Sequence, residues 1–385
     1  MTGQNLIRPG GFQHEPDRFS LLESVRQFAL ELLEREGELD AARARHAHYF
    51  SSHLLDRYPD PRDWDAAAVQ DLRPEIDELR IAIEWLAVHD PDRALDVAVG
   101  AWRLWFVVGR LTDADRWLEM VLDATSNDES ARRVRALYGR ALIGHARASL
   151  ERAIAFDVAS LTLAERLGDQ RGIGDACNHM AGMIALATGD GLRSMELVQR
   201  AIEGYTAVDD RHGVAESLLN RASLTFDAGR LDDALADGQQ VLDYCRADGK
   251  DVLRSNTLHG VAGIAALAGQ YELAIELLRE ALELSRRLGY DIFLSSNIAV
   301  LDSLLVEAGQ YEDALRLAEF TREFSRNRTA GGDVSDPFQR VDSDRVTMLA
   351  NLTAESAERA MSAGIRMTPS EAVDQGLALL TQLSC

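Results

Sequence analysis

The chain has 385 residues, of which 46% are apolar, so it contains ample material for a hydrophobic core. Its formal net charge is −22, which argues against nucleic acid as a partner of the bulk surface, because a duplex binder needs clustered cations. Three cysteines without a CxxC pair, no signal-peptide pattern and no apolar run long enough to span a bilayer indicate a cytoplasmic protein without a disulfide framework.

The first part of the chain predicts helices that precede the repeats. Residues 1–18 are rich in proline and glycine and are expected to be irregular. Apolar residues at helical spacing predict helices over residues 20–36, 42–55 and 63–88. We therefore divide this part into an N-terminal segment, 1–38, and a helical subdomain, 39–128.

All five tryptophans fall between Trp64 and Trp117, within this helical subdomain. Trp102 and Trp105 stand at helical spacing, where aromatic side chains usually pack inward. We expect them in the core rather than in a ligand cage.

Residues 129–328 contain a repeat with a period of 40 residues. Its turns carry Gly189, Gly229, Gly269 and Gly309, and Gly109 lies two periods upstream. Mostly small residues stand seven before and five after each turn glycine, as in Ala222 and Ala234 or Ala262 and Ala274, with Asp302 as an exception. Facing small residues let two antiparallel helices approach closely, so each period predicts a helix pair, with helices of about 17 residues and roughly 25 Å.

The C-terminal segment, 329–385, is expected to cap the array. It begins with a glycine-containing loop and predicts one helix over residues 343–362. Thr368, Pro369 and Glu371 then form an N-cap, a first-turn proline and a capping-box glutamate for a last helix that ends near Leu383.

The repeat resembles the tetratricopeptide repeat, in the pattern of a small residue, Gly-x-Leu or Gly-x-Tyr, and alanine. Two copies match this pattern closely: the first contains Ala222, Gly229, Leu231 and Ala234, and the second contains Ala262, Gly269, Tyr271 and Ala274. The resemblance implies an all-α protein, an α-solenoid of tetratricopeptide-like helix pairs. Its period is about six residues longer than the usual 34, which implies longer helices.

The flanking segments resemble large actinobacterial transcriptional regulators. These combine a STAND-type (NB-ARC-like) ATPase, a helical sensor array and often a C-terminal LuxR-type DNA-binding domain. The strings that carry the resemblance are residues 18–33, 44–50, 75–86, 104–111 and 367–380. It implies that residues 18–33 close a winged helix and that residues 367–380 precede a LuxR-type domain.

The ATPase itself has no counterpart in this sequence. A P-loop requires Gly-x-x-x-x-Gly-Lys-Ser/Thr, and Lys250, the only lysine, is followed by Asp251. No Gly-x-Ser-x-Gly elbow is present either. We therefore expect neither an enzyme nor a cofactor, and interpret the chain as the sensor and linker portion of such a regulator.

Several residues that suggest chemistry have simpler structural explanations. His46, His48 and His53 lie on one predicted helix, but zinc needs three or four ligands at defined spacing, so we predict a packed helix face and no metal. The basic stretch that begins at Arg132 is expected to be a solvated polar face. Cys177 is expected to be a buried small hydrophobe.

The most promising binding surface is the concave groove that the resembled fold would form. Positions 2 and 5 of the first helix in each pair line that groove in the family. Here they supply a polar row of five residues, His179, Glu216, Asn256, His259 and Ser296. A solvated inner face without a ligand is the alternative explanation of the same row.

The sequence thus favours a non-enzymatic protein-interaction or signal-sensing module that binds a protein, a peptide or a small effector in this groove. The alternatives are a DNA-binding regulator that uses residues 1–38 as part of a winged helix, and a scaffold with no ligand. We expect neither direct nucleic-acid contact nor membrane attachment.

Overall fold

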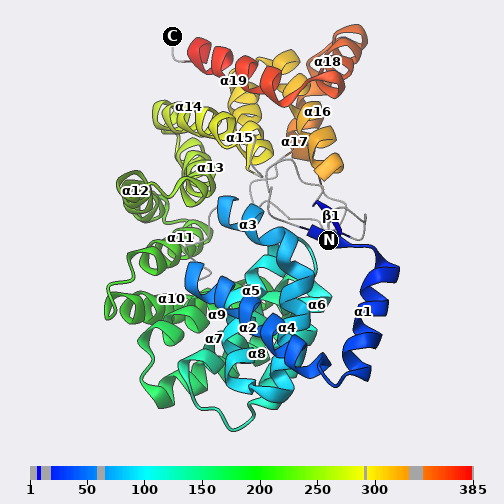
Figure 1. Ribbon diagram of the computed structural model, residues 1–385. Helices are drawn as coiled ribbons and strands as arrows, with labels where there is room; N and C mark the ends of the chain where they lie inside the picture. Colours follow the sequence, from blue (N-terminus) through cyan, green and yellow to red (C-terminus); the bar gives the residue numbers. More distant parts are fainter. Residues whose placement is uncertain (1–6, 10–18, 59–65, 290–292, 329–340, 384–385) are drawn as a thin grey trace. The chain divides into compact units, whose positions relative to one another are not determined.

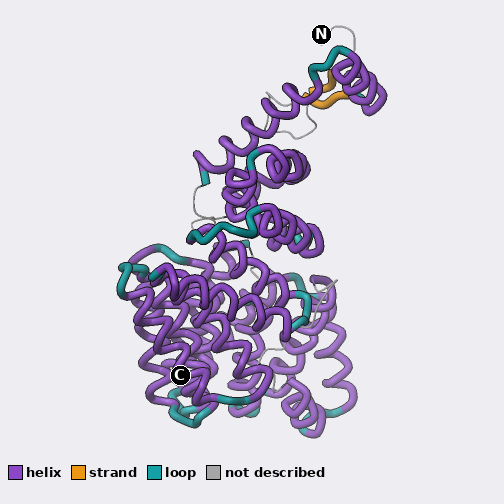
Figure 2. The backbone as a smooth tube through the Cα atoms, turned by 90° about the horizontal axis from the view of Figure 1, so that it is seen from below, coloured by secondary structure: helices purple, strands orange, loops and turns teal. Residues whose placement is uncertain are grey.

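A computed structural model describes residues 7–9, 19–58, 66–289, 293–328 and 341–383. Helices make up almost all of this part of the chain (Figure 2). The chain forms two compact units, unit 1 (Met1–Ala176) and unit 2 (Cys177–Cys385). The protein is therefore all-α, and its helices follow one another in antiparallel pairs, as the tetratricopeptide-like pattern predicts (Figure 1).

Unit 1 begins with two short antiparallel strands, β1 (Ile7–Pro9) and β2 (Phe19–Leu21), in which Ile7 pairs with Leu21. Strand β1 corrects the expectation that residues 1–18 are irregular throughout; residues 1–6 and 10–18 lie outside the described residues. The helices of this unit are α1 (Glu23–Arg35), α2 (Leu39–Arg57), α3 (Ala66–Leu72), α4 (Ile76–His89), α5 (Pro91–Val107), α6 (Leu111–Ala124), α7 (Ala131–Ala146) and α8 (Leu150–Leu167).

Helix α1 differs from the other long helices because none of its residues is buried. Its apolar side chains recur at helical spacing, yet Phe28 is 65% exposed and Leu32 is 37% exposed. The sequence predicted the amphipathic pattern of this helix, but the pattern alone could not tell whether its apolar face is covered.

The core of unit 1 lies among α2, α4, α5, α6 and α7. Trp105 of α5 and Trp117 of α6 are almost fully buried, and their ring centroids lie 4.5 Å apart. Trp102 is 8% exposed, so the prediction that Trp102 and Trp105 belong to the core is confirmed. Because each large aromatic side chain buries a large apolar area, these tryptophans contribute strongly to the core of unit 1.

Two predicted helices are each split in the structure. The predicted helix over residues 63–88 is broken by a short 3-10 turn, Arg73–Glu75, because Pro74 cannot donate the backbone hydrogen bond of a continuous helix. The predicted helix over residues 343–362 is α17 (Val341–Ala350) followed by α18 (Ala354–Arg366). There the Thr353 hydroxyl accepts from the Ser356 backbone N–H and starts a new helix.

The glycine turns adopt the conformation that their spacing predicted. Gly109, Gly189, Gly229, Gly269 and Gly309 all have φ between +67° and +78°. This left-handed conformation is costly for a residue with a Cβ atom, which explains glycine at these positions. The small residues that flank the turns are buried, since Ala222, Ala234, Ala262 and Ala274 are at most 2% exposed. The close helix–helix approach predicted from small residues is therefore confirmed.

The copy missing from the glycine series lies between α7 and α8, where Ala148 has φ +55°. The hydrogen bonds of this turn match those around Gly229. Ala148 N–H donates to the His145 carbonyl as Gly229 N–H donates to that of Phe226, and Ser149 N–H donates to Gly144 as Arg230 N–H donates to Thr225. The repeated helix pair therefore continues through unit 1 with alanine in place of glycine.

Unit 2 holds the rest of the stack and its cap. The boundary between the units falls within α9 (Gln170–Thr188). The remaining helices are α10 (Gly191–Thr206), α11 (Arg211–Asp227), α12 (Leu231–Asp248), α13 (Asp251–Leu267), α14 (Tyr271–Arg287), α15 (Leu294–Glu307), α16 (Tyr311–Arg328), α17, α18 and α19 (Pro369–Leu383). Most have 16 to 19 residues, so longer helices account for the extended period.

The C-terminal helices pack on the last repeats and extend their core. Helix α18 approaches α16 so closely at Gly364 that an added Cβ would meet the Arg316 carbonyl oxygen. The predicted capping box of α19 is confirmed, because Glu371 accepts from the Thr368 backbone N–H and the Thr368 hydroxyl accepts from the Glu371 N–H. The Thr368 backbone N–H and hydroxyl both donate to the Glu371 carboxylate, and these two hydrogen bonds lower the pKa of Glu371.

Candidate functional site

The five residues of the predicted polar row lie on the first helices of successive pairs in unit 2. His179 is on α9, Glu216 on α11, Asn256 and His259 on α13, and Ser296 on α15. Glu216 is exposed, and the other four are half-buried. The structure thus places all five on equivalent helices with solvent access; that they line a concave groove remains a prediction.

Two members of the row are oriented by neighbouring rings or charges. The His259 ring stacks on Phe293 at the start of α15, with centroids 5.5 Å apart and planes inclined by 18°. On α11, His212 Nε2 lies 3.5 Å from Glu216 Oε1. Asn256 and Ser296 make no side-chain hydrogen bond to another described residue, and both are half-buried.

A hydrogen bond beside the polar row was not predicted from the sequence. Asn220 Nδ2 of α11 donates to Asn178 Oδ1 of α9 over 2.9 Å, which joins two first helices. An asparagine amide offers two donors and two acceptor lone pairs, so this pair keeps groups that can bind a backbone amide. The two residues are 42 positions apart, so they do not occupy equivalent positions of the 40-residue period. Asn220 stands at position 6 of its helix, and the predicted row used only positions 2 and 5.

The far end of the row contains a buried carboxyl group. Asp302 of α15 is 4% exposed, and its Oδ1 has no hydrogen-bond partner among the described residues. Burial, together with the charge of Asp344, raises the pKa of Asp302 well above its usual value. Beside it, the Ser303 hydroxyl donates to Asp344 of α17 over 2.9 Å. Asp302 stands where the other copies have a small residue, and its buried, unpartnered carboxyl group lowers the stability of the fold.

Two cysteines of unit 2, Cys177 and Cys245, are buried in its core. Cys177 and Cys245 are fully buried, so the prediction that Cys177 is a small core residue is confirmed. Burial raises the pKa of the Cys245 thiol to about 11, which disfavours the thiolate. Within the described part of the chain, no three His, Cys, Asp or Glu residues are grouped so as to hold a metal ion.

A separate surface pocket of about 470 Å³ lies against α11 and α12. Val214 and Leu218 form its apolar side, and they lie on a different face of α11 from Glu216. Tyr244 also lines it, and burial with the charge of Asp248 raises the pKa of that phenol to about 12. The pocket is thus distinct from the polar row.

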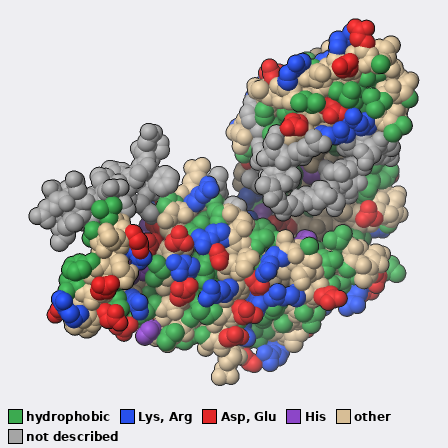
Figure 3. Space-filling model, turned by 90° about the vertical axis from the view of Figure 1, so that its right-hand side faces the viewer, with side chains coloured by type: hydrophobic (Ala, Val, Ile, Leu, Met, Phe, Trp, Pro, Cys, Tyr) green, Lys and Arg blue, Asp and Glu red, His purple; other side chains and the backbone are tan. Residues whose placement is uncertain are grey.

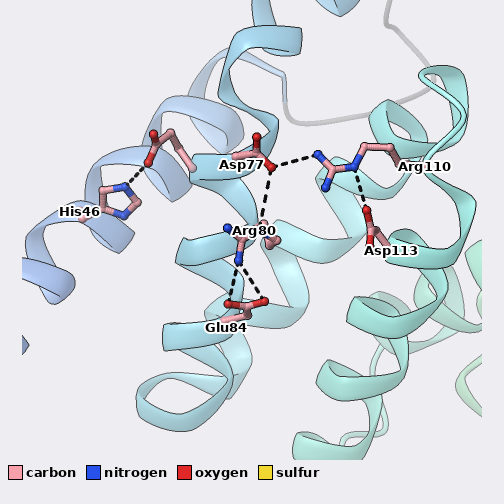
Figure 4. Close-up of polar contacts among 7 residues, drawn as sticks. His46, Asp77, Arg80, Glu84, Arg110 and Asp113 are labelled. Atoms are coloured by element: carbon pink, nitrogen blue, oxygen red, sulfur yellow. Dashed lines mark hydrogen bonds and ion pairs between the residues drawn. The ribbon is translucent and has the colours of Figure 1, made fainter. Parts of the chain in front are cut away.

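Several polar side chains of unit 1 form ion pairs, some between helices and some within one helix. His46 Nε2 lies 2.7 Å from Glu78 Oε2, which joins α2 to α4 and gives His46 a packing role (Figure 4). His53 lies 3.4 Å from Glu75, and His48 is exposed. The other contacts drawn there are Asp77–Arg110, Asp77–Arg80, Arg80–Glu84 and Arg110–Asp113.

Acidic and basic side chains are interspersed over the face shown in Figure 3, without a broad patch of one sign. The basic residues that begin at Arg132 are likewise accompanied by acidic side chains or backbone acceptors. Arg132 pairs with Asp92, Asp96 and Asp128, and Arg133 donates to the Leu122 and Thr125 carbonyls. Its prediction as a polar helix face is confirmed. No helix in the described ranges is long and apolar enough to cross a membrane.

No family model matches this chain. Over 108 residues it is 34% identical to the "Putative HTH-type transcriptional regulator Mb0914c" of Mycobacterium bovis. That stretch is 28% of this chain and 12% of the regulator, so the chain spans only a small part of the curated relative that it matches.

Solved structures share the fold. One is a STAND protein with a tetratricopeptide repeat sensor from Pyrococcus horikoshii, with a TM-score of 0.56, 13% identity, and coverage of 99% of this chain and 59% of that one. Another is the apo form of the quorum sensor NprR from B. thuringiensis, with a TM-score of 0.50, 13% identity, and coverage of 92% and 100%. At these identities the likeness establishes a tetratricopeptide-like solenoid and nothing finer.

Proposed function

We propose that this chain is a non-enzymatic sensing module of a transcriptional-regulator system, and that it captures a protein or peptide partner along the polar row of unit 2. The observation that carries the proposal is the placement of His179, Glu216, Asn256, His259 and Ser296 on successive first helices, beside the Asn178–Asn220 pair. Repeated helix pairs present extended surfaces that suit such partners. The shared fold with a STAND sensor and a quorum sensor supports the same role.

The chemistry of the row favours an extended peptide over a compact apolar ligand. Asparagine amides bind the backbone N–H and C=O groups of a strand that lacks partners of its own. The stacked His259 and Phe293 rings add a flat surface for an aromatic or apolar side chain. Because the contacts come from different helix pairs, a bound partner would favour one relative placement of those pairs, which is how a signal would pass along the array.

The test is a selection of peptides from a random displayed library with the full chain immobilised. Selected peptides should bind in solution, and the double variant N220A/N256A should weaken their binding roughly tenfold, since each of the two amide hydrogen bonds contributes about 0.7 kcal/mol. Q239A, which removes an exposed amide from the second helix α12, is the matched control and should leave affinity unchanged. ATP or GTP hydrolysis by the purified chain would contradict the non-enzymatic part of the proposal.

A second candidate function has one observation in its favour. Strands β1 and β2 form a small antiparallel sheet directly before α1, as the last part of a winged helix would. A gel shift with duplex DNA separates the two proposals. Salt-sensitive binding that is lost on deletion of residues 1–38 would favour the DNA-binding alternative, whereas the sensing proposal predicts no shift.

A further inference from the structure

Three arginine side chains converge on one carboxylate in unit 1. Arg140 Nε of α7 donates to Asp115 Oδ1 of α6 over 3.0 Å. Arg147 Nη1 and Arg152 Nη2 both donate to the other oxygen, Oδ2, over 3.0 Å and 3.2 Å. The Asp115 side chain is 12% exposed, so two guanidinium groups share a single, nearly buried acceptor atom.

The cluster has an excess of positive charge. Arg140 also donates to Glu119 Oε1 over 3.0 Å, so the ion pairs of this cluster join three guanidinium groups to two carboxylates. Each guanidinium has five N–H donors, yet Arg147 and Arg152 each make one hydrogen bond to a described residue. In a protein with a net charge of −22, this is a local site whose unused donors attract an anion.

These side chains surround a cavity of about 190 Å³. A pocket for a drug-sized ligand is roughly 300–1,000 Å³, and a water molecule occupies about 30 Å³, so the cavity suits an anion of a few heavy atoms. Ser149 also lines it, and its side chain makes no capping hydrogen bond to α8. The lining residues are Asp115, Arg140, Gly144, Arg147, Ser149, Arg152 and Phe156.

The cluster is held in place by its surroundings. The Arg140 guanidinium carbon lies 4.3 Å from the Phe156 ring centroid, and that of Arg152 lies 5.9 Å away, so one ring orients two of the three cations. Helices α7 and α8 approach closely beside the cavity, since a Cβ on Gly144 would lie 3.2 Å from the Ala153 backbone nitrogen. Binding would therefore need little rearrangement.

We propose that this cavity binds a phosphate group, either as inorganic phosphate or as the phosphoryl group of a small monoester. Paired guanidinium forks match the oxygens of a tetrahedral dianion, and Arg147 and Arg152 can donate to it with the N–H groups that do not bind Asp115. The Ser149 hydroxyl supplies one further donor. This site lies within unit 1 and does not depend on the proposed partner surface of unit 2.

The test is calorimetric titration of the full chain with inorganic phosphate, glycerol phosphate and acetate at constant ionic strength. Phosphate should bind the unmodified chain and acetate should not. The variant R147Q/R152Q should lose roughly tenfold or more in phosphate affinity. Its control, R135Q/R166Q, removes two exposed arginines from the same two helices and should change affinity less than about twofold, by the screening of surface charges.

Three results would overturn the proposal: no phosphate binding at millimolar concentrations, equal loss in both variants, or equal binding of acetate. R147K/R152K keeps the charge without the fork and should bind with intermediate affinity, which guards against a folding defect in the glutamine variant. Binding of inorganic phosphate together with glycerol phosphate would identify the phosphoryl group of a larger molecule as an accepted ligand. Binding of inorganic phosphate alone would identify the free ion.

Discussion

The helix pairs α7–α8 and α11–α12 share a backbone plan but use one equivalent arginine differently. Arg140 lies eight residues before the left-handed turn residue Ala148, and Arg221 lies eight residues before Gly229. Eight residues after the turn, α12 has Asp237, and α8 has Phe156. Arg221 binds both oxygens of Asp237, at 2.7 Å and 2.8 Å.

Because α8 offers an aromatic ring at this position, Arg140 stacks on Phe156 and its donors turn to Asp115 of the preceding helix. In α11–α12 one cation matches one anion, so the pair is a closed structural contact. In α7–α8 the charges are unequal and a cavity remains beside them. The comparison teaches that two copies of a repeat can share a backbone while one residue difference decides whether an arginine forms a closed ion pair or lines a charged cavity.

The largest expected effect comes from removing each equivalent arginine. R221M leaves Asp237, 7% exposed, without a partner, and should lower the free energy of unfolding by about 3 kcal/mol. R140M leaves Asp115 with Arg147 and Arg152, and should lower it by about half as much. Urea unfolding followed by circular dichroism compares the two, and the tryptophans between residues 64 and 117 report on unit 1 separately. Equal losses would refute the distinction between a closed pair and a shared carboxylate.

A second prediction concerns the small-residue position at which α11 has Ala222 and α15 has Asp302. D302A should raise the free energy of unfolding by roughly 2 kcal/mol at neutral pH, because it removes a buried acceptor without a partner. The pKa of Asp302 is raised on folding, so native stability falls as pH rises from the ordinary value of 3.8 toward the raised value.

The gain from D302A should therefore be small at acid pH and grow toward neutrality. Urea midpoints measured across this range for both proteins give the difference directly, since the other carboxyl groups contribute equally to each. A gain that does not change with pH would show that Asp302 is not a titrating buried acid.

The smallest expected effects concern the turn residues, where exchanging alanine and glycine should change the stability in opposite directions at the two turns. A148G should stabilise the chain by about 1 kcal/mol, since glycine adopts the positive φ of this turn without steric strain. G229A should destabilise it by a similar amount; an added Cβ meets no atom within 4 Å, so only backbone strain acts there. Thermal unfolding monitored by circular dichroism tests both. The same sign for the two variants would mean that the turns are not equivalent.

Much of the fold could be predicted because its signals are local. Turn glycines, flanking small residues and the capping box each concern a few neighbouring positions, and all appear as predicted. The copy at Ala148 was missed because alanine lacks the glycine signal although its backbone takes the same conformation. The breaks at Pro74 and Thr353 were missed because apolar spacing continues across them.

The proposed binding sites were harder to predict because their residues come together only in the folded chain. The polar row follows the period, so its helices could be named, but the pairing of Asn178 with Asn220 depends on how adjacent first helices lie. Asp115, Arg140 and Arg152 come from three helices, and no spacing in the sequence joins them. Burial of Asp302 likewise depends on α17, which packs against α15 from beyond the repeat.

The measurement that tests the sensing account most directly is the affinity of selected peptides for the full chain and its N220A/N256A variant. The account predicts that peptides selected on the full chain lose roughly tenfold in affinity with this variant and keep their affinity with Q239A and with R147Q/R152Q. Peptides that bind all four proteins equally would show that the polar row of unit 2 is not the partner surface.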